Sequence, residues 1–595
     1  MKLKKILLVA SVAVLTTGIL SGCESYKKKN SGKADLEWYM GLSHQKADGT
    51  SYVDTTKAGD SVAAVALEDG YSDNYAIIKG NDAFINIETV SNVIDKRFYW
   101  DKKNDYLMFT DASTVYTCGI GTNYINDGVK DEKANYKVSI VEGKKLFINV
   151  KFIKRFHDLD YAVSKKSGKT PARVFLAYTN DKKTMMEISE DTQIRTKGNY
   201  QNLVVSEVKE GTVVSVIETG KNWNKVITRE GYVGYVPVSD LGSTSKKQPR
   251  FKTDDDTYTH ITLDNQVSMV WFPIYNQGAN KTYNEKMKHT KGVDVVSPTW
   301  FSIDDKRGNL STLAELDFVE AAHKDHVQVW ALVDDFKNKS YTKTVLKNTK
   351  LRNRLVKNIM FYMDGYEIDG VNVDFEHISA DMKDDYLQFI RELAIQCRKE
   401  KKVLSIDNYA QTLESDIYDL AHQYKVADYV VMMNYDEHTK GSPKAGSVAS
   451  IPFVDSAINN ALKHTKKGDR VINGMPFYTR AWVETPVKKA EDKSGVLVKD
   501  AVMGDYYLTV QTLSMSEAKD AYKRAKAKPK YDNEAGQNYV TYNKKGINYE
   551  IWLEDKTSIK ARMELINKYN LGGGAFWSLG QESDDVWDTI YEYTK

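Results

Sequence analysis

Three polar side chains alternate with apolar ones in the segment Asp369-Gly-Val-Asn-Val-Asp-Phe-Glu376. In a β-strand, residues two apart point to the same face, so Asn372, Asp374 and Glu376 project together. Two carboxylates on one face raise the proton affinity of one of them, which suits a general acid that must stay protonated near neutral pH. A solvated strand has the same alternation, although its polar face more often carries Lys, Thr or Ser. The spacing therefore indicates either an acid catalyst or an exposed strand.

Strand-like apolar runs and helical stretches alternate from about residue 258 onward, which indicates a parallel α/β fold. Eight such units fit a (β/α)8 barrel with an α+β insertion at about 484–548. Helices are predicted at 383–399 and 454–464. The predicted strands are 268–272, 293–296, 327–332, 370–375, 403–406, 429–433, 470–474 and 573–577.

The C-terminal ends of barrel strands are where active sites gather, and four predicted strands end in polar or aromatic residues. Strand four ends at Asp374 and Glu376. The other three lead into Met433-Asn-Tyr-Asp436, into Met475-Pro-Phe-Tyr-Thr-Arg-Ala-Trp482 and into Trp577-Ser-Leu-Gly580. Each aromatic residue taken singly is also typical of a core, but four such ends in succession favour a site.

These strand ends resemble the signatures of glycoside hydrolase family 18, the chitinase-like enzymes. The run DGVNVDFE is similar to the family pattern DGxDxDxE, with Asn372 where most members have Asp. The resemblance is closest to the branch that includes bacterial spore-cortex and cell-wall glucosaminidases, in which an Asn at this position is tolerated. The later segments resemble the family patterns Met-x-Tyr-Asp and Pro-Phe-Tyr-Gly-Arg-x-Trp, with Thr479 replacing Gly. The resemblance covers residues 258–595.

The resemblance implies a retaining, substrate-assisted glycosidase that uses no metal and no cofactor. Glu376 falls on the proton donor, and Asp374 and Tyr435 fall on residues that orient the substrate's acetamido group. The substrate must then contain N-acetylglucosamine. The remaining matched positions, to which substrate binding is assigned, are Asp369 (a structural acidic position of the pattern), Asn372, Asp436, Tyr478, Arg480 and Trp577.

The N-terminus reads as an export signal, because Lys2, Lys4 and Lys5 precede an apolar run at 6–15. The run is too short for a comfortable membrane span. Residues 1–23 end in Leu20-Ser-Gly-Cys23, which looks like a bacterial lipobox with Cys23 as the lipidated residue. An ordinary signal peptide or a retained anchor is the alternative. We therefore expect a lipid anchor on the outer face of the bacterial cytoplasmic membrane.

A tether at 24–35 follows, and its Lys/Ser-rich part at 26–33 is expected to be disordered. Residues 36–185 contain a weak repeat, in which Phe84-Ile-Asn-Ile87 and Phe147-Ile-Asn-Val150 each open a strand, short helix and strand pair. This α+β stalk domain resembles the small module at the N-terminus of copper amine oxidases. It has no His cluster, so no copper is inferred.

Short strands separated by turn residues at 187–241 predict a small β-barrel. Its ending, Gly231-Tyr-Val-Gly-Tyr-Val236, resembles bacterial SH3-like domains, which commonly bind wall peptides. A mere spacer barrel is the alternative. Residues 242–257 read as a Ser/Lys-rich linker to the catalytic barrel.

Composition limits the other classes of function. A chain of 595 residues predicts about two to four domains. The near balance of 84 Lys+Arg against 81 Asp+Glu gives no indication of a nucleic-acid partner. Besides Cys23 only Cys118 and Cys397 are present, so a zinc site is excluded by count and a disulfide is not expected.

The leading hypothesis is a cell-surface hydrolase of β-1,4 bonds in N-acetylglucosamine-containing glycans. Peptidoglycan is favoured because the expected lipid anchor and SH3-like domain place the enzyme against the wall. A chitinase or chitooligosaccharide hydrolase is the second hypothesis. A non-catalytic glycan-binding protein or a structural wall adaptor is the third, although both predict loss of site residues such as Glu376.

Overall fold

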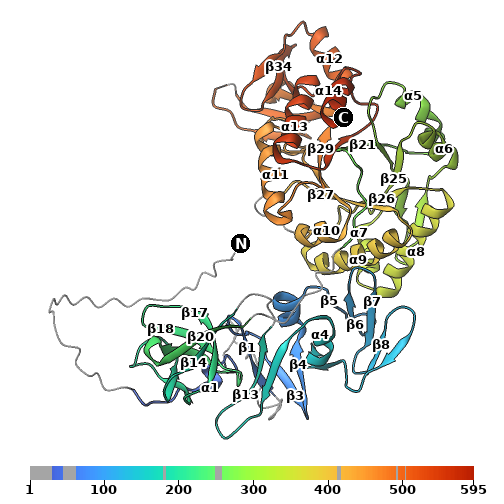
Figure 1. The fold of residues 1–595 in the computed structure, drawn as a ribbon. Helices are drawn as coiled ribbons and strands as arrows, with labels where there is room; N and C mark the ends of the chain where they lie inside the picture. Colours follow the sequence, from blue (N-terminus) through green and yellow to red (C-terminus); the bar gives the residue numbers. More distant parts are fainter. Residues whose placement is uncertain are drawn as a thin grey trace, which may run out of the picture. The chain divides into compact units, whose positions relative to one another are not determined.

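The computed structural model describes residues 30–43, 62–177, 183–247, 258–411, 417–490, 494–502 and 504–595 (Figure 1). These residues fall into two compact units. The first contains those up to residue 86 and those between 152 and 247, and the second contains 87–151 together with those from 258 onward. The expected signal segment with Cys23, residues 24–29 of the tether and residues 248–257 of the linker lie outside the described residues.

Eight parallel strands of the second unit close into a ring. β21 pairs with β22 and β36, and β22 also pairs with β25, so the sheet joins on itself. This is the predicted (β/α)8 barrel, and each predicted strand overlaps an observed one. The strands are β21 (Val267–Phe272), β22 (Val295–Pro298), β25 (Gln328–Asp334), β26 (Gly370–Asp374), β27 (Val403–Tyr409), β28 (Tyr429–Met433), β29 (Val471–Pro476) and β36 (Gly573–Trp577).

Alternate strand residues form two apolar clusters. Val371, Val373 and Phe375 belong to the larger cluster, which the surrounding helices share, whereas Trp271 and Trp330 belong to the smaller one inside the ring. The strands are near-continuous apolar runs because both of their faces are buried. Two short strands, β23 (Phe301–Ile303) and β24 (Leu310–Thr312), extend the sheet beside β25.

Helices between the strands follow amphipathic sequence patterns. α9 has the predicted bounds, and α11 contains the predicted helix at 454–464. α11 begins after Ser450, whose hydroxyl accepts a hydrogen bond from the Phe453 amide, with a proline in the first turn. The helices are α5 (Tyr283–Met287), α6 (Leu316–Lys324), α7 (Lys339–Leu346), α8 (Thr349–Gly365), α9 (Lys383–Lys399), α10 (Leu420–Val426), α11 (Ile451–Thr465), α13 (Lys556–Tyr569) and α14 (Val586–Thr594), with 3-10 turns η4 (Gln277–Thr282) and η5 (Ala380–Met382).

The predicted α+β insertion lies between β29 and β36 and is wider than 484–548. Its sheet has the order β31-β32-β30-β35-β34-β33, and its core includes Ala518, Val540 and Ile551. The elements are β30 (Tyr478–Pro486), η6 (Val487–Lys489), β31 (Val496–Val498), β32 (Tyr506–Ser514), α12 (Met515–Arg524), β33 (Lys530–Asp532), β34 (Gln537–Lys544) and β35 (Ile547–Trp552).

Residues 87–151 belong to the same unit as the barrel. They form a five-stranded antiparallel sheet and a hairpin. The elements are α3 (Ile87–Thr89), the π-helix η2 (Val90–Ile94), β5 (Phe98–Asp101), β6 (Tyr106–Thr110), β7 (Val115–Gly119), β8 (Tyr124–Asn126), β9 (Asp131–Lys133), β10 (Ser139–Glu142) and β11 (Lys145–Asn149).

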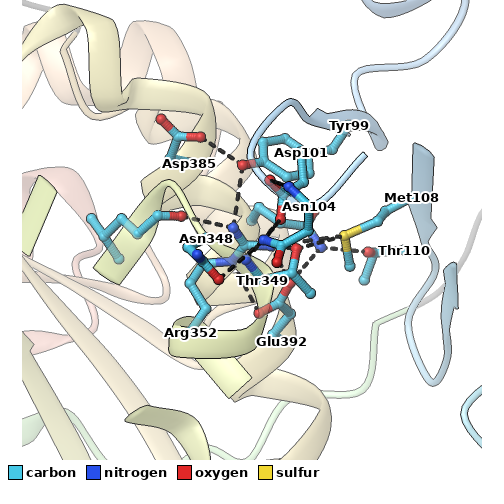
Figure 2. A network of polar contacts seen from close by, with 12 residues as sticks. Tyr99, Asp101, Asn104, Met108, Thr110, Asn348, Thr349, Arg352, Asp385 and Glu392 are labelled. Carbon is cyan, nitrogen blue, oxygen red and sulfur yellow. Dashed lines mark hydrogen bonds and ion pairs between the residues drawn. The ribbon is translucent and has the colours of Figure 1, made fainter. Parts of the chain in front are cut away.

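Buried polar contacts join this segment to α8 and α9 (Figure 2). The Arg352 guanidinium is paired with Glu392, with an Nη2–Oε1 distance of 3.0 Å, and its Nη1 donates to Tyr99 Oη at 3.2 Å. Asp101 Oδ2 accepts the Thr349 amide at 2.7 Å. The segment therefore shields the Arg352–Glu392 ion pair from water.

The first unit contains the rest of the expected stalk and the small β domain. β1 pairs in parallel with β13 and antiparallel with β3. Both copies of the predicted repeat have the expected order of strand, short helix and strand pair, but β5–β6 continues into β7 while β12–β13 joins β1. The elements are α1 (Leu36–Tyr39), β1 (Val62–Leu67), β2 (Gly70–Tyr71), β3 (Ala76–Lys79), β4 (Asp82–Asn86), β12 (Asp160–Ser164) and β13 (Ala172–Ala177), with α4 (Val150–Phe156) leading from the hairpin into this unit.

The small β domain is a seven-stranded antiparallel sheet of order β16-β15-β19-β18-β17-β14-β20. The predicted linker is wrong at 242–247, because these residues belong to β20, which pairs with β14. The expected disorder is wrong at 30–33, where Gly32 O accepts the Val204 amide at 2.9 Å. The strands are β14 (Lys183–Ile188), β15 (Thr192–Arg195), β16 (Val204–Val208), β17 (Val213–Glu218), β18 (Trp223–Ile227), β19 (Val233–Pro237) and β20 (Leu241–Lys247), with a 3-10 turn η3 (Val238–Asp240).

Two further observations concern the whole described part of the chain. Cys118 and Cys397 are buried free thiols. Within the described residues, no helix has both the length and the apolar character that crossing a bilayer requires.

Candidate active site

The C-terminal ends of six barrel strands bring ionisable and aromatic side chains together. β26 supplies the central pair, because Asp374 is its last residue and Glu376 follows two positions later. The other residues at this rim are Asp334 and Asp335 (β25 end), Asp407 and Tyr409 (β27), Tyr435 and Asp436 (after β28), Tyr478 and Arg480 (after β29) and Trp577 (β36).

The alternation in β26 is that of a barrel strand and not of a solvated one. Phe375 is buried and stacks on Phe389 of α9, with ring centroids 5.4 Å apart. On the opposite face Asn372 is fully buried and Asp374 is 4% exposed. A polar face that is hidden from bulk water excludes the exposed-strand alternative.

Glu376 is half-buried, so it is open to a substrate from the rim. Its Oε2 accepts a hydrogen bond from Tyr409 Oη at 2.6 Å, and its backbone amide donates to Asp335 Oδ1 at 3.0 Å. Burial is the main cause that raises the pKa of Glu376, and the charge of Asp335 raises it further, while the bond from Tyr409 lowers it. A carboxyl group with a raised pKa can act as a proton donor nearer neutral pH.

Asp374 lies in an acidic environment. Burial raises the pKa of Asp374 well above its usual range, and the charges of Asp407 and Glu376 act in the same direction. Asp334 faces Asp374 in the strand register of β25 and β26. Its pKa is also raised by burial, although the hydroxyl of Ser302, which donates at 2.6 Å, opposes that shift.

Asn372 and Asp369 are placed away from the rim, which corrects the assignment of substrate binding to both. Asn372 lies inside the ring, where Trp271 Nε1 donates to its Oδ1 at 2.9 Å. Asp369 precedes the first residue of β26, at the opposite end of the strand. Its Oδ2 lies 2.8 Å from His323 Nε2 and accepts the Val329 amide at 2.8 Å. Asp369 therefore has a structural position.

A second polar group lies after β28 and β29. Arg480 Nη1 donates to Asp436 Oδ1 at 2.7 Å, and the Tyr478 hydroxyl donates to the same oxygen. The rings of Tyr435 and Tyr478 meet edge to face, with centroids 6.3 Å apart. Burial raises the pKa of Tyr435 well above its usual value, so its hydroxyl remains a hydrogen-bond donor.

Trp577 forms an apolar surface at the end of β36. Its ring meets Trp271 edge to face at 5.8 Å between centroids, and it is half-buried. Tyr435 and Trp577 both pack against the apolar cluster inside the ring, which fixes their positions. A half-buried aromatic ring at the same rim as Asp374 and Glu376 suits contact with the apolar face of a sugar.

Four rim residues were missed by sequence reasoning: Asp334, Asp335, Asp407 and Tyr409. The predicted fifth strand ends at Ile406, whereas β27 continues to Tyr409. The local signal was weak, since Asp407 and Asn408 are consecutive polar residues that break the alternation after Ile406.

The site combines a proton donor, a buried carboxyl group, a tyrosine hydroxyl and an aromatic surface. These groups suit acid-catalysed cleavage of a glycosidic bond. Within the described residues, no group of three or more His, Cys, Asp or Glu side chains is arranged to hold a metal ion.

Comparisons with known proteins identify a family and several similar proteins. The family model described as "Glycosyl hydrolases family 18" matches residues 270–582, which is over half of the chain. The uncharacterized glycosylase YvbX of Bacillus subtilis is 25% identical over 335 residues, covering 54% of this chain and 90% of that protein. The cortical fragment-lytic enzyme of Bacillus subtilis is 22% identical over 274 residues, covering 43% and 58%. The crystal structure of a chitinase from Chromobacterium violaceum has a TM-score of 0.47 and 18% identity, covering 55% and 98%.

Proposed function

We propose that this chain cleaves β-1,4 bonds of peptidoglycan at a cell surface. The chain belongs to glycosyl hydrolase family 18 and is a glycosidase acting on N-acetylglucosamine-containing glycans. One observation carries the catalytic part of this proposal. Glu376, half-buried at the end of β26 and with a raised pKa, stands beside the buried carboxyl group of Asp374.

The proposed reaction is retaining and substrate-assisted. Glu376 donates its proton to the glycosidic oxygen, which leaves with the bonding electron pair. The carbonyl oxygen of the substrate's own 2-acetamido group attacks the anomeric carbon and forms an oxazolinium ring. Asp374 accepts the acetamide N–H and Tyr435 donates its hydroxyl to the acetamide oxygen, so both orient the nucleophile. Glu376 then accepts a proton from a water molecule whose oxygen attacks the anomeric carbon. The bond between that carbon and the acetamide oxygen breaks, which opens the ring and restores the acetamide.

Two lines of support favour peptidoglycan as the glycan. A relative that matches this chain over 274 residues is a cortical fragment-lytic enzyme, although the match covers 58% of that protein. The small β domain resembles SH3-like modules in its Gly231–Val236 segment, and we propose that it binds a wall peptide. Cleavage of a chitin-like chain in place of peptidoglycan would overturn this part of the proposal.

We also propose that a lipid on Cys23 anchors the protein to the outer face of the cytoplasmic membrane. The support is the sequence: three lysines, an apolar run and Leu20-Ser-Gly-Cys23. The anchor and the proposed wall-binding domain would hold the barrel against its substrate.

The decisive experiment incubates the purified protein, without its first 23 residues, with peptidoglycan and with chitin oligomers. Mass analysis of the new reducing ends identifies the cleaved bond and the glycan. We expect N-acetylglucosamine at the reducing ends of peptidoglycan fragments. Glu376→Gln protein serves as the control, and binding without cleavage by the wild type would instead support a non-catalytic wall protein.

A further inference from the structure

A second buried carboxyl group lies next to Asp374 on the neighbouring strand. In the parallel pairing of β26 and β27, Asn372 is opposite Ser405 and Val373 is opposite Ile406. The next positions in this register are Asp374 and Asp407. Both side chains point into the ring, because they lie two residues beyond the inward pair Asn372 and Ser405. Asp407 is 1% exposed and Asp374 is 4% exposed, so bulk water solvates neither carboxyl group.

Asn372 determines how Asp407 is held. The indole N–H of Trp271 is a donor only, so the atom it meets at 2.9 Å must be the amide oxygen of Asn372. Ser297 Oγ donates to the same oxygen at 3.2 Å. The amide nitrogen of Asn372 consequently faces β27, where it donates to Asp407 Oδ1 at 2.7 Å and to Ser405 Oγ at 3.0 Å. One oxygen of Asp407 is therefore fixed as an acceptor.

The other oxygens of the two carboxyl groups are unsatisfied. Asp407 Oδ2 and Asp374 Oδ1 are both buried and have no hydrogen-bond partner among the described residues. An unpaired buried acceptor is costly, and two adjacent buried anions are more costly still. A single proton held by the pair removes both costs, as in other carboxyl pairs that share one proton.

We propose that Asp407 is a positioning residue that holds this proton and so allows Asp374 to be the anion when substrate binds. The carboxyl group that the pattern DGxDxDxE has at the position of Asn372 is thus supplied from β27. The role of Asp407 in catalysis rests on the proposed function. In the free protein, burial and the charge of Asp407 raise the pKa of Asp374. When substrate binds, the shared proton lies on Asp407 Oδ2, and Asp374 carries the negative charge and accepts the N–H of the substrate's acetamide. No bond to carbon changes at either residue.

The titratable groups around the two carboxyl groups favour the retention of one proton by the pair. Those that interact with Asp407 are Asp374 and Glu376 of β26 and its end, Tyr386 of α9 and Tyr435 after β28. None of the four carries a positive charge. Burial is the main cause that raises the pKa of Asp407, to about 8. The donors Asn372 and Trp271 oppose this shift, and the charge of Glu376 adds to it.

The first test is Asp407→Asn. The new side chain keeps an oxygen that accepts from Asn372, so a merely structural role predicts an unchanged enzyme. We expect kcat on peptidoglycan to fall roughly tenfold to 100-fold with little change in KM, less than the loss when a general acid itself is removed. Ser405→Ala is the matched control, since it removes the other acceptor of Asn372 and leaves both carboxyl groups. A folded Asp407→Asn enzyme with wild-type kcat would overturn the proposal.

The second test exchanges the two partners. Asn372→Asp combined with Asp407→Asn restores a carboxyl group beside Asp374 and keeps one amide in the network. We expect this double variant to recover a large part of the kcat that Asp407→Asn loses. A folded double variant that remains as slow as the single one would show that the carboxyl pair is not what matters.

The third test needs no activity. A group whose pKa is raised on folding stabilises the protein fully below its unfolded pKa, near 4, and this contribution is lost as the pH rises toward the folded value. The difference in melting temperature, wild type minus Asp407→Asn, should therefore fall steadily between about pH 5 and pH 8. A pH-independent difference would overturn the inference. A falling difference in a protein that cleaves no glycan would support the proton on Asp407 and reject the proposed function.

Discussion

At the scale of single residues, the site is governed by how carboxyl groups are buried next to one another. Glu376, Asp374 and Asp407 all have raised pKa values, and burial is the first cause in each case. The differences lie in the partners: Glu376 has a tyrosine donor, Asp407 has an amide donor, and Asp374 Oδ1 has no partner among the described residues. These environments separate the proton donor from the group that must become an anion.

Replacing Glu376 with Gln tests the proton donor. The amide keeps the shape and accepts from Tyr409 but cannot release a proton, so turnover should fall about 10²- to 10⁴-fold. The measurement is kcat on peptidoglycan, with circular dichroism and melting temperature to show that folding is retained. Hydrolysis at a near-normal rate by the folded variant would refute the assignment of Glu376.

Tyr409→Phe tests how the acid is tuned. The Tyr409 hydroxyl favours the charged form of Glu376, so its removal should raise the pKa of Glu376 further. A general acid with a higher pKa stays protonated to higher pH, and the alkaline limb of the kcat profile should move upward. An alkaline limb that stays in place or moves downward would contradict the proposed pairing.

Substrate assistance predicts a distinct pattern of inhibition and substrate choice. A thiazoline analogue of N-acetylglucosamine resembles the cyclic intermediate and should bind far more tightly than substrate. Substrates with a free amine at the cleaved residue should be inert because they lack the nucleophile. Tyr435→Phe should lower kcat more than it raises KM. A covalent glycosyl ester on Asp374, detected by mass spectrometry, would instead indicate a two-carboxylate mechanism.

At the scale of secondary-structure elements, strand length decides which residues reach the site. β27 is extended to Tyr409 by its parallel pairing with β28, in which Tyr409 lies opposite Met433. The helices α8 and α9 are held together by the Arg352–Glu392 pair, which the segment 87–151 covers (Figure 2). Because α9 packs against Phe375, the residue that follows β26, this pair lies one layer behind that strand.

Arg352→Met should destabilise the second unit strongly. The substitution leaves Glu392 buried without its cation, at a cost of about 3–5 kcal/mol. Calorimetric melting measures the effect, and Arg352→Met combined with Glu392→Leu should recover much of it. The exposed pair Lys209–Asp191 provides the control, since Lys209→Met should leave the melting temperature unchanged. Equal effects of the buried and exposed substitutions would contradict this account.

At the scale of the whole molecule, the chain comprises two compact units whose boundaries do not follow the sequence order. Residues 87–151 belong with the barrel, while the segments before and after them belong with the small β domain. A barrel cut from the chain at residue 258 would lose Tyr99 and Asp101, which contact Arg352 and Thr349. Studies of activity are therefore best made on the chain from residue 24 onward.

The anchor is tested by Cys23→Ser. If Cys23 carries the lipid, the variant should move from the membrane fraction to the soluble fraction, because only the lipid then holds the processed protein. Fractionation and immunoblotting of the bacterial host measure this, with the wild type as the reference. A variant that stays membrane-bound with its precursor uncleaved would show a retained anchor.

The sequence by itself determined the barrel, the order of its strands and the placement of Asp374 and Glu376 at the end of one strand. Alternation and apolar runs are local properties, so the spacing of Asn372, Asp374 and Glu376 predicts a shared strand face, and the chain order predicts which strand ends carry polar groups. The positions of Tyr435, Tyr478 and Trp577 at the rim follow from the same rule.

Only the tertiary structure decided the rest. Asp407 and Tyr409 join the site because pairing between neighbouring strands sets the length of β27, and Asp369 leaves it because it lies at the other end of β26. Residues 242–247 become a strand because β14 offers them an edge. Each of these outcomes depends on contacts between segments far apart in the chain, which composition and local spacing do not record.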